Sequence, residues 1–182
     1  SHGGAPNVKP GQPLPEEYLN ENVGLVEKGV CNLVKQIENV RKYGVPVVVA
    51  INKFGTDSKS EIEVVKKASI EAGALDAVVS THFEEGGKGA VDLAHAVINA
   101  AEQESHFKPL YDLSLPFEQK MTTIVRELYN GKDISMSPDA VKKLEMIRAQ
   151  GFGDLPICVA KTQYSLSHDA TLKGVPCDFT FP

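Results

Sequence analysis

The sequence predicts an α/β protein in which a mostly parallel sheet carries helices on both faces. Two observations indicate that class. Stretches with helical periodicity alternate with short apolar runs rich in β-branched residues, and each of the first two runs follows a glycine suited to end a helix. This alternation is typical of parallel sheets, because a crossover between parallel strands needs a helix-length connection.

Composition and charge exclude several classes of protein. The 182 residues are 42% hydrophobic and 24% charged, which is typical of soluble globular chains and not of disordered or collagen-like ones. The formal net charge of −5 argues against general nucleic-acid binding, which needs a basic surface. The longest continuous apolar run, 45–51, is far shorter than the roughly 18 residues of a membrane-spanning helix.

The three cysteines indicate a reducing compartment. Cys31, Cys158 and Cys177 are far apart and odd in number, and each lies in or near an apolar segment, so we expect buried thiols without a redox role. The five histidines show no ligand spacing with one another or with cysteine, and the sequence therefore predicts no metal site.

The chain divides into three regions by composition. Residues 1–19 are rich in glycine and proline and predict a linker or loop. Residues 20–108 predict a repeat of helix and strand whose loops carry the candidate site. Residues 109–182 predict a helical segment followed by the last strands of the same core.

The repeat begins with a long amphipathic helix from residue 20 to Tyr43, ended by Gly44, and a strand at 45–51 that is apolar enough to be buried on both faces. A second helix, capped by Asp57 or Ser58, runs through Ala72 to Gly73 and precedes a strand at 75–80. A glycine-rich turn at 84–89 then leads into a third helix with apolar residues from position 91 to 101.

The later half predicts a helix at 116–129, a short segment at 133–136, and a helix that opens at Ser137-Pro138 and runs to about Gln150. Leu155–Ala160 predicts a further strand. Residues 177–182 look like the start of a strand without a partner, so we expect this sequence to be an internal piece of a longer protein.

Ligands of parallel sheets bind beyond the carboxyl ends of the strands, which directs attention to residues 52–57 and 81–89. Asn52 follows the first strand, and its side-chain amide can donate and accept hydrogen bonds at a purine edge. The alternative is structural, with Asn52 a turn residue and Asp57 a helix cap.

Two phenylalanines lie in these polar loops. Phe54 and Phe83 each follow a strand end by a few residues, and two such rings could sandwich a flat heterocycle. The alternative is an ordinary pair of core or rim aromatics.

Two further segments could bind anions or a nucleotide. Gly86, Gly87, Lys88 and Gly89 precede a helix, where backbone N–H groups favour negative charge, although such a turn can serve only to reverse the chain. The loop at 161–165 is dense in donors and could line a phosphate or purine pocket, or could simply be solvated. Its residues are Lys161, Thr162, Gln163, Tyr164 and Ser165. The phosphate-cradling pattern of Gly, four residues and Gly-Lys-Ser/Thr is absent from the sequence, and so is a hydrolase nucleophile elbow.

Together these segments resemble the formate–tetrahydrofolate ligase family, in the form found in eukaryotic C1-tetrahydrofolate synthases. The resemblance covers essentially the whole chain. It is carried by His2-Gly-Gly, Glu27-Lys-Gly, Asn32-Leu, Gln36-Ile-Glu-Asn39, the run from Gly44 to Asn52, Phe54 with Thr56-Asp57, Gly86–Gly89, Leu110-Tyr111, the run from Gly151 to Cys158, and Ala160–Ser165. The segment Gly11–Pro15 favours the eukaryotic form.

The resemblance implies a reaction and its ligands. The family uses ATP and Mg²⁺ to join formate to N10 of tetrahydrofolate through formyl phosphate. Phe54 and Phe83 would hold the pterin, with Phe83 in place of the tryptophan of many members, and Gly86 to Gly89 would border the folate. Asn52, Lys161, Thr162, Gln163 and Ser165 would border the nucleotide.

The resemblance also implies a nucleoside-triphosphate-hydrolase-like fold and a homo-oligomer. The family's phosphate loop and its formyl-phosphate-binding residues, which include the catalytic groups and bind most of ATP and Mg²⁺, would lie outside this sequence. We therefore expect an isolated chain to be inactive. The rival readings are a non-catalytic nucleotide-binding module and an oligomerisation module. The expected compartment is the cytoplasm, with the mitochondrion as the alternative.

Overall fold

The computed structural model describes residues 3–9, 11–160 and 162–182. The chain forms two compact units, residues 1–107 and residues 108–182, and each has buried apolar residues of its own. Both units contain helices and a small parallel sheet, so the α/β class predicted from the sequence is confirmed.

The first unit contains α1 (Glu16–Leu19), α2 (Val23–Gly29), α3 (Cys31–Arg41), β1 (Val48–Asn52), α4 (Lys59–Glu71), β2 (Asp76–Ser80), α5 (His82–Glu85), the 3₁₀ helix η1 (Gly86–Ala90) and α6 (Val91–Ala101). The single helix predicted from residue 20 is therefore two helices, which meet at Val30 just after Gly29, a residue that disfavours helix interiors. The predicted loop at 1–19 contains the short helix α1.

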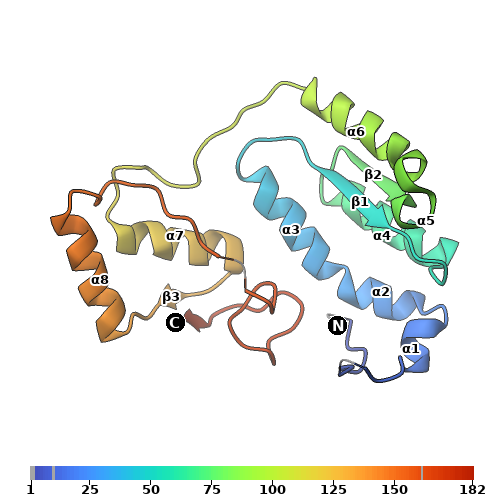
Figure 1. Cartoon of the computed structure of the whole chain (residues 1–182), viewed down its shortest axis with the longest axis horizontal. Coiled ribbons are helices and arrows are strands. Elements are labelled where there is room, and N and C mark those ends of the chain that lie inside the picture. Colours follow the sequence, from blue (N-terminus) through green and yellow to red (C-terminus); the bar gives the residue numbers. More distant parts are fainter. Residues whose placement is uncertain (1–2, 10, 161) are drawn as a thin grey trace. The chain divides into compact units, whose positions relative to one another are not determined.

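Strands β1 and β2 are parallel, as the repeat predicted, and they pair in register from Val48 with Asp76 to Asn52 with Ser80. Helix α4 makes the crossover between them, and α4 and α6 both contact the two strands (Figure 1). Because the register pairs Asn52 with Ser80, the loops that follow the two strands leave the sheet side by side.

The core of this unit lies between α3 and the sheet. Ile37 of α3 packs in one cluster with Val49 and Ala77, which are register partners and so project from the same face. Ala50, on the opposite face of β1, is exposed. The prediction of a strand buried on both faces is wrong, because a continuous apolar run fixes the hydrophobicity of a strand but not the elements that cover it.

Local signals fixed the ends of the helices. Ser58, not Asp57, caps α4: its hydroxyl accepts from Glu61 N, and Glu61 accepts in return from Ser58 N. Gly44 ends the turn after α3 with φ +72°. Helix α6 formed as expected, but its large apolar residues Val91, Val97 and Ile98 are exposed, and so are Ala94 and Ala101.

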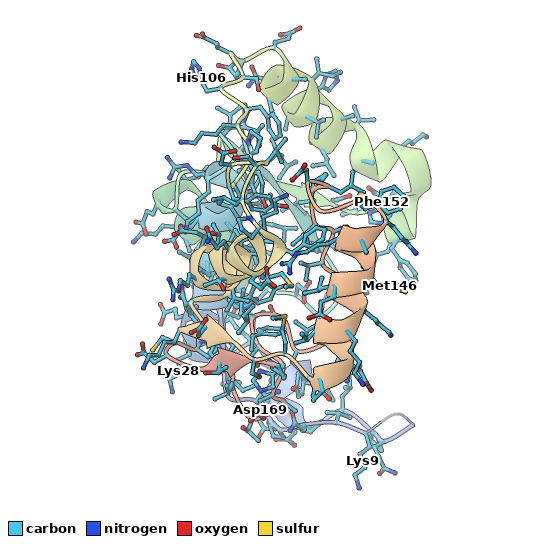
Figure 2. All side chains as sticks on the ribbon, turned by 90° about the vertical axis from the view of Figure 1, so that its left-hand side faces the viewer. Lys9, Lys28, His106, Met146, Phe152 and Asp169 are labelled. Atoms are coloured by element: carbon cyan, nitrogen blue, oxygen red, sulfur yellow. The ribbon has the colours of Figure 1, made fainter. Side chains whose placement is uncertain are left out.

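The second unit contains α7 (Phe117–Tyr129), β3 (Asp133–Ile134), α8 (Pro138–Ala149) and β4 (Thr180–Phe181). Ser137 caps α8 with Pro138 in its first turn, as predicted. Residues 177–182 were expected to begin a strand without a partner. That expectation is wrong, because β4 pairs in parallel with β3. Figure 2 labels Met146 on α8 and Phe152 beyond its end, and both are largely exposed.

The predicted strand at Leu155–Ala160 is not formed. A strand needs a neighbouring backbone, and here backbone groups of 154–157 bond to side chains instead. Asp154 O and Leu155 O accept from Lys120 Nζ, and Ile157 N donates to the Tyr111 hydroxyl. Apolar character alone therefore gave the wrong assignment.

The three cysteines are exposed, which corrects the expectation of buried thiols. Cys31 is the first residue of α3, Cys158 lies in the extended segment just described, and Cys177 precedes β4. Apolar neighbours in the sequence do not bury a side chain unless a second element packs over it.

Candidate functional site

The candidate site of the first unit begins where β1 and β2 end. Asn52 is the last residue of β1 and is exposed, and its register partner Ser80 is buried at the end of β2. Lys53 N donates to Ser80 O, so the loop after β1 remains attached to the second strand for one residue beyond the sheet. The two predicted loops therefore lie together.

A reciprocal pair of hydrogen bonds shapes the loop after β1. Phe54 N donates to Asp57 Oδ2 at 2.8 Å, and Asp57 N donates to Phe54 O at 3.0 Å. Asp57 thus holds the backbone that carries Phe54, and it does not cap α4. The phenyl ring is 58% exposed, so it is a surface ring rather than a core residue.

Hydrogen bonds within residues 80–89 fix the segment that follows β2. Ser80 Oγ lies 2.9 Å from His82 Nδ1, Thr81 N donates to Gly89 O, and Thr81 Oγ1 donates to Glu85 Oε2 at 2.5 Å. A Cβ at Gly89 would lie 2.5 Å from the Thr81 carbonyl carbon, so only glycine allows this approach. These contacts hold the short helix α5, which carries Phe83.

Phe83 and Phe54 lie ring beside ring. Their centroids are 6.3 Å apart, their planes are tilted by 48°, and Phe83 is 81% exposed. A flat ring between two others needs them nearly parallel and about 7 Å apart, twice the carbon contact distance of ~3.5 Å. As it stands the pair is tilted and closer than this. Exposed side chains change rotamer within picoseconds to nanoseconds.

The glycine-rich residues lie beside this pair in the same unit. Gly86 has φ +62°, and Gly86, Gly87 and Lys88 are exposed in η1 immediately before α6. Only Gly89 is half-buried, through its contact with Thr81. The exposed backbone of this turn is consistent with a role at the edge of a ligand.

The predicted nucleotide residues belong to both units. Asn52 lies in the first, whereas Thr162, Gln163 and Ser165 lie in the second, and Lys161 is outside the described residues. Thr162 Oγ1 donates to Ser167 O and accepts from Tyr164 N, so this hydroxyl stabilises its own loop. Gln163 is exposed, and Ser165 has φ +71°.

Sequence reasoning missed an apolar cavity of about 820 Å³ in the second unit. It lies between α7 and α8 and is lined by Met121, Ile124, Leu144 and Phe181 among others. Tyr129 also lines it, with its ring centroid 5.1 Å from that of Phe181, and burial raises the pKa of its hydroxyl. The amphipathic pattern of α7 was the available signal, but the cavity depends on β4 returning to β3.

No group of three acidic, histidine or cysteine side chains that could hold a metal ion is present in 3–9, 11–160 and 162–182. Across the same residues, no helix is long and apolar enough to cross a bilayer.

The fold is a mixed α/β arrangement with small parallel sheets, in which two exposed aromatic rings follow the ends of β1 and β2. The family model of formate–tetrahydrofolate ligase matches residues 1–182. The chain therefore belongs to the formate–tetrahydrofolate ligase family.

The similar proteins are C-1-tetrahydrofolate synthases. This chain is 62% identical to the mitochondrial and 61% identical to the cytoplasmic protein of Saccharomyces cerevisiae, each over 182 residues. It is 54% identical over 181 residues to the cytoplasmic protein of Homo sapiens. All three matches include 100% of this chain but 19% of the relative, so the chain spans about a fifth of the length of these proteins.

Proposed function

We propose that this chain supplies the pterin-holding part of an ATP-dependent ligase that makes 10-formyltetrahydrofolate. In that reaction ATP phosphorylates formate, which gives formyl phosphate and ADP. N10 of tetrahydrofolate then attacks the formyl carbon, a new C–N bond forms, the C–O bond to phosphate breaks, and phosphate leaves while N10 releases its proton. Phosphorylation is needed because a carboxylate oxygen is a poor leaving group.

The observation that supports this proposal is the pair formed by Phe54 and Phe83. Both rings are exposed on loops that the strand register brings together, and each loop has its own hydrogen bonds that fix its backbone. Covering exposed apolar rings with a flat ligand lowers the free energy, because it removes apolar surface from water. In this proposal Gly86 to Gly89 border the same ligand.

The proposal also assigns residues to the nucleotide. Asn52 and the loop 161–165, with Lys161, Thr162, Gln163 and Ser165, would border ATP within a nucleoside-triphosphate-hydrolase-like fold. The phosphate loop, the catalytic residues and the groups that hold most of ATP and Mg²⁺ would lie in the remainder of the ligase. The full-length protein would be a homo-oligomer of the cytoplasm or the mitochondrion, the two compartments for which the yeast relatives are named.

The test uses a full-length ligase that carries this sequence. Phe54→Ala and Phe83→Ala should each raise the KM for tetrahydrofolate by about ten-fold, since an aromatic stack typically contributes 1–3 kcal/mol, and should leave the KM for ATP unchanged. Phe107→Ala is the matched control. Phe107 is also an exposed phenylalanine of this unit, but its neighbour His106 bonds to Gly44, before β1 begins. An unchanged KM for tetrahydrofolate in both variants would refute the proposal.

A second measurement concerns the chain by itself. We expect residues 1–182 to release no ADP in a formate- and folate-dependent manner, because the phosphate-binding groups would be missing. Calorimetric titration with a reduced folate should detect binding that each phenylalanine variant weakens by about ten-fold. A purine affinity that is the same in the native chain and in both variants would favour a nucleotide-binding module without ligase activity.

A further inference from the structure

The most buried charged side chain of the described residues is Lys120, and no step of the proposed reaction uses it. Lys120 lies on α7 and has 0% of its surface exposed. Removing an ammonium group from water is costly unless dipoles or charges replace the lost hydration. The groups that contact Lys120 must therefore replace the hydration that its ammonium group has lost.

Both hydrogen bonds of Lys120 go to one stretch of backbone. Lys120 Nζ donates to Asp154 O at 3.2 Å and to Leu155 O at 3.0 Å, and it lies 5.5 Å from the centroid of the Phe117 ring. Hydrogen bonds from an ammonium to carbonyl oxygens are about twice as strong as neutral ones, and the ring face adds a cation–π attraction.

Tyr111 also bonds to this stretch of backbone, two residues after Leu155. Ile157 N donates to its hydroxyl at 2.9 Å, and Pro156 between the two contacts has no N–H to satisfy. Side chains thus bond the carbonyls of Asp154 and Leu155 and the amide of Ile157, while Leu155 N donates to Phe152 O. The path of this segment is set by Lys120 and Tyr111 together.

The segment leads directly into the loop proposed to border ATP. That loop has internal bonds of its own, from Thr162 Oγ1 to Ser167 O at 2.6 Å and from Ser167 Oγ to Asp169 O at 2.7 Å. In the sequence, four residues, 158–161, separate the segment 154–157 from the loop that begins at Thr162. We propose that Lys120 and Tyr111 are positioning residues, which hold 154–157 so that Thr162, Gln163 and Ser165 meet the nucleotide. This inference rests on the nucleotide role proposed above.

The test compares Tyr111→Phe with Tyr18→Phe in a full-length ligase that carries this sequence. Tyr111→Phe keeps the ring and removes only the acceptor for Ile157 N. Tyr18→Phe also removes one hydroxyl bond, to Pro6 O, but in the other unit. We expect Tyr111→Phe to raise the KM for ATP about five-fold, the typical effect of one hydrogen bond, with the KM for tetrahydrofolate unchanged. The Ile157 amide should also exchange faster with solvent. Tyr18→Phe should change neither quantity.

Lys120→Met is a second variant with a larger expected effect: it too should raise the KM for ATP and leave the KM for tetrahydrofolate unchanged. If Lys120→Met does not fold, the result for Tyr111→Phe decides whether the positioning role is correct. Gln163→Ala separates the two proposals. If it raises the KM for ATP while Tyr111→Phe does not, the positioning role is wrong and the nucleotide role stands. If neither variant changes the KM for ATP, both roles are wrong. An equal rise in both KM values would mean a general loss of structure and would also overturn the positioning role.

Discussion

The rings of Phe54 and Phe83 lie 6.3 Å apart at a tilt of 48°, although one follows β1 and the other follows β2. The parallel register places their loops together, and the tilt leaves the two rings in contact rather than open. A flat ligand placed between these rings would require at least one of them to rotate. A larger second ring should change the affinity for a flat ligand in a measurable way.

Phe83→Trp should lower the KM for tetrahydrofolate of the full-length ligase by about two- to five-fold, because an indole offers a larger stacking face than a phenyl ring. Steady-state kinetics with tetrahydrofolate as the varied substrate measures this change. The same substitution at exposed Phe107 should have no effect. A higher KM in Phe83→Trp would show that the space beside Phe54 does not admit a larger ring.

Gly89→Ala should destabilise the first unit by about 1–3 kcal/mol, because its Cβ would lie 2.5 Å from the carbonyl carbon of Thr81 and the α5 segment would have to move. Gly87 is the matched control from the same turn, since a Cβ there meets no atom within 4 Å. Gly87→Ala should change stability by less than about 0.5 kcal/mol. Denaturant unfolding of residues 1–182 provides both values, and equal effects would contradict this account.

Glu61→Gln should lower stability at pH 7 by about 1 kcal/mol and weaken its dependence on acid. Hydrogen bonds from Asn22 N and then Ser58 hold the pKa of Glu61 below its ordinary value of 4.5. A lowered folded-state pKa means that the stabilisation is fully present above pH 4.5 and is lost as the pH falls through the folded value.

Unfolding curves at several pH values test this sign. The difference in stability between the native chain and Glu61→Gln should be constant above about pH 5 and should shrink below pH 4.5. Glu63→Gln is the control from the same helix, because Glu63 has only an exposed ion pair with Lys66. A difference that grows in acid would be inconsistent with the bonds to Asn22 and Ser58.

Asp178→Asn should speed the alkylation of Cys177 at pH 8. The thiol of Cys177 is exposed, and its hydrogen bond with the Asp178 carboxylate, together with the negative charge, raises its pKa. A raised pKa means less thiolate at a given pH and a slower reaction. Mass spectrometry of residues 1–182 after timed alkylation gives the rate at each cysteine. The rates at Cys31 and Cys158 should not change.

The place of the candidate loops in the fold could be predicted from the sequence because the pattern at the strand ends is local. The apolar runs located β1 and β2, and the parallel rule placed residues 52–57 and 81–89 at the same edge. Whether Phe54 and Phe83 would face each other or turn into the core could not be predicted. That outcome depends on the register and on the bonds of Asp57 and Thr81, which link residues that the sequence pattern does not pair.

The sequence by itself determined the α/β class and several helix ends, as Gly44 and Ser137 show, and it limited the cap of α4 to Asp57 or Ser58, because caps and glycine turns act over a few residues. Only the tertiary structure decided what becomes of an apolar run. Leu155–Ala160 is not a strand, since Lys120 and Tyr111 bond its backbone, and β4 is one, since β3 lies beside it. Strand pairing and burial are properties of two segments together, and the free energy that selects the partner arises only when the chain has folded.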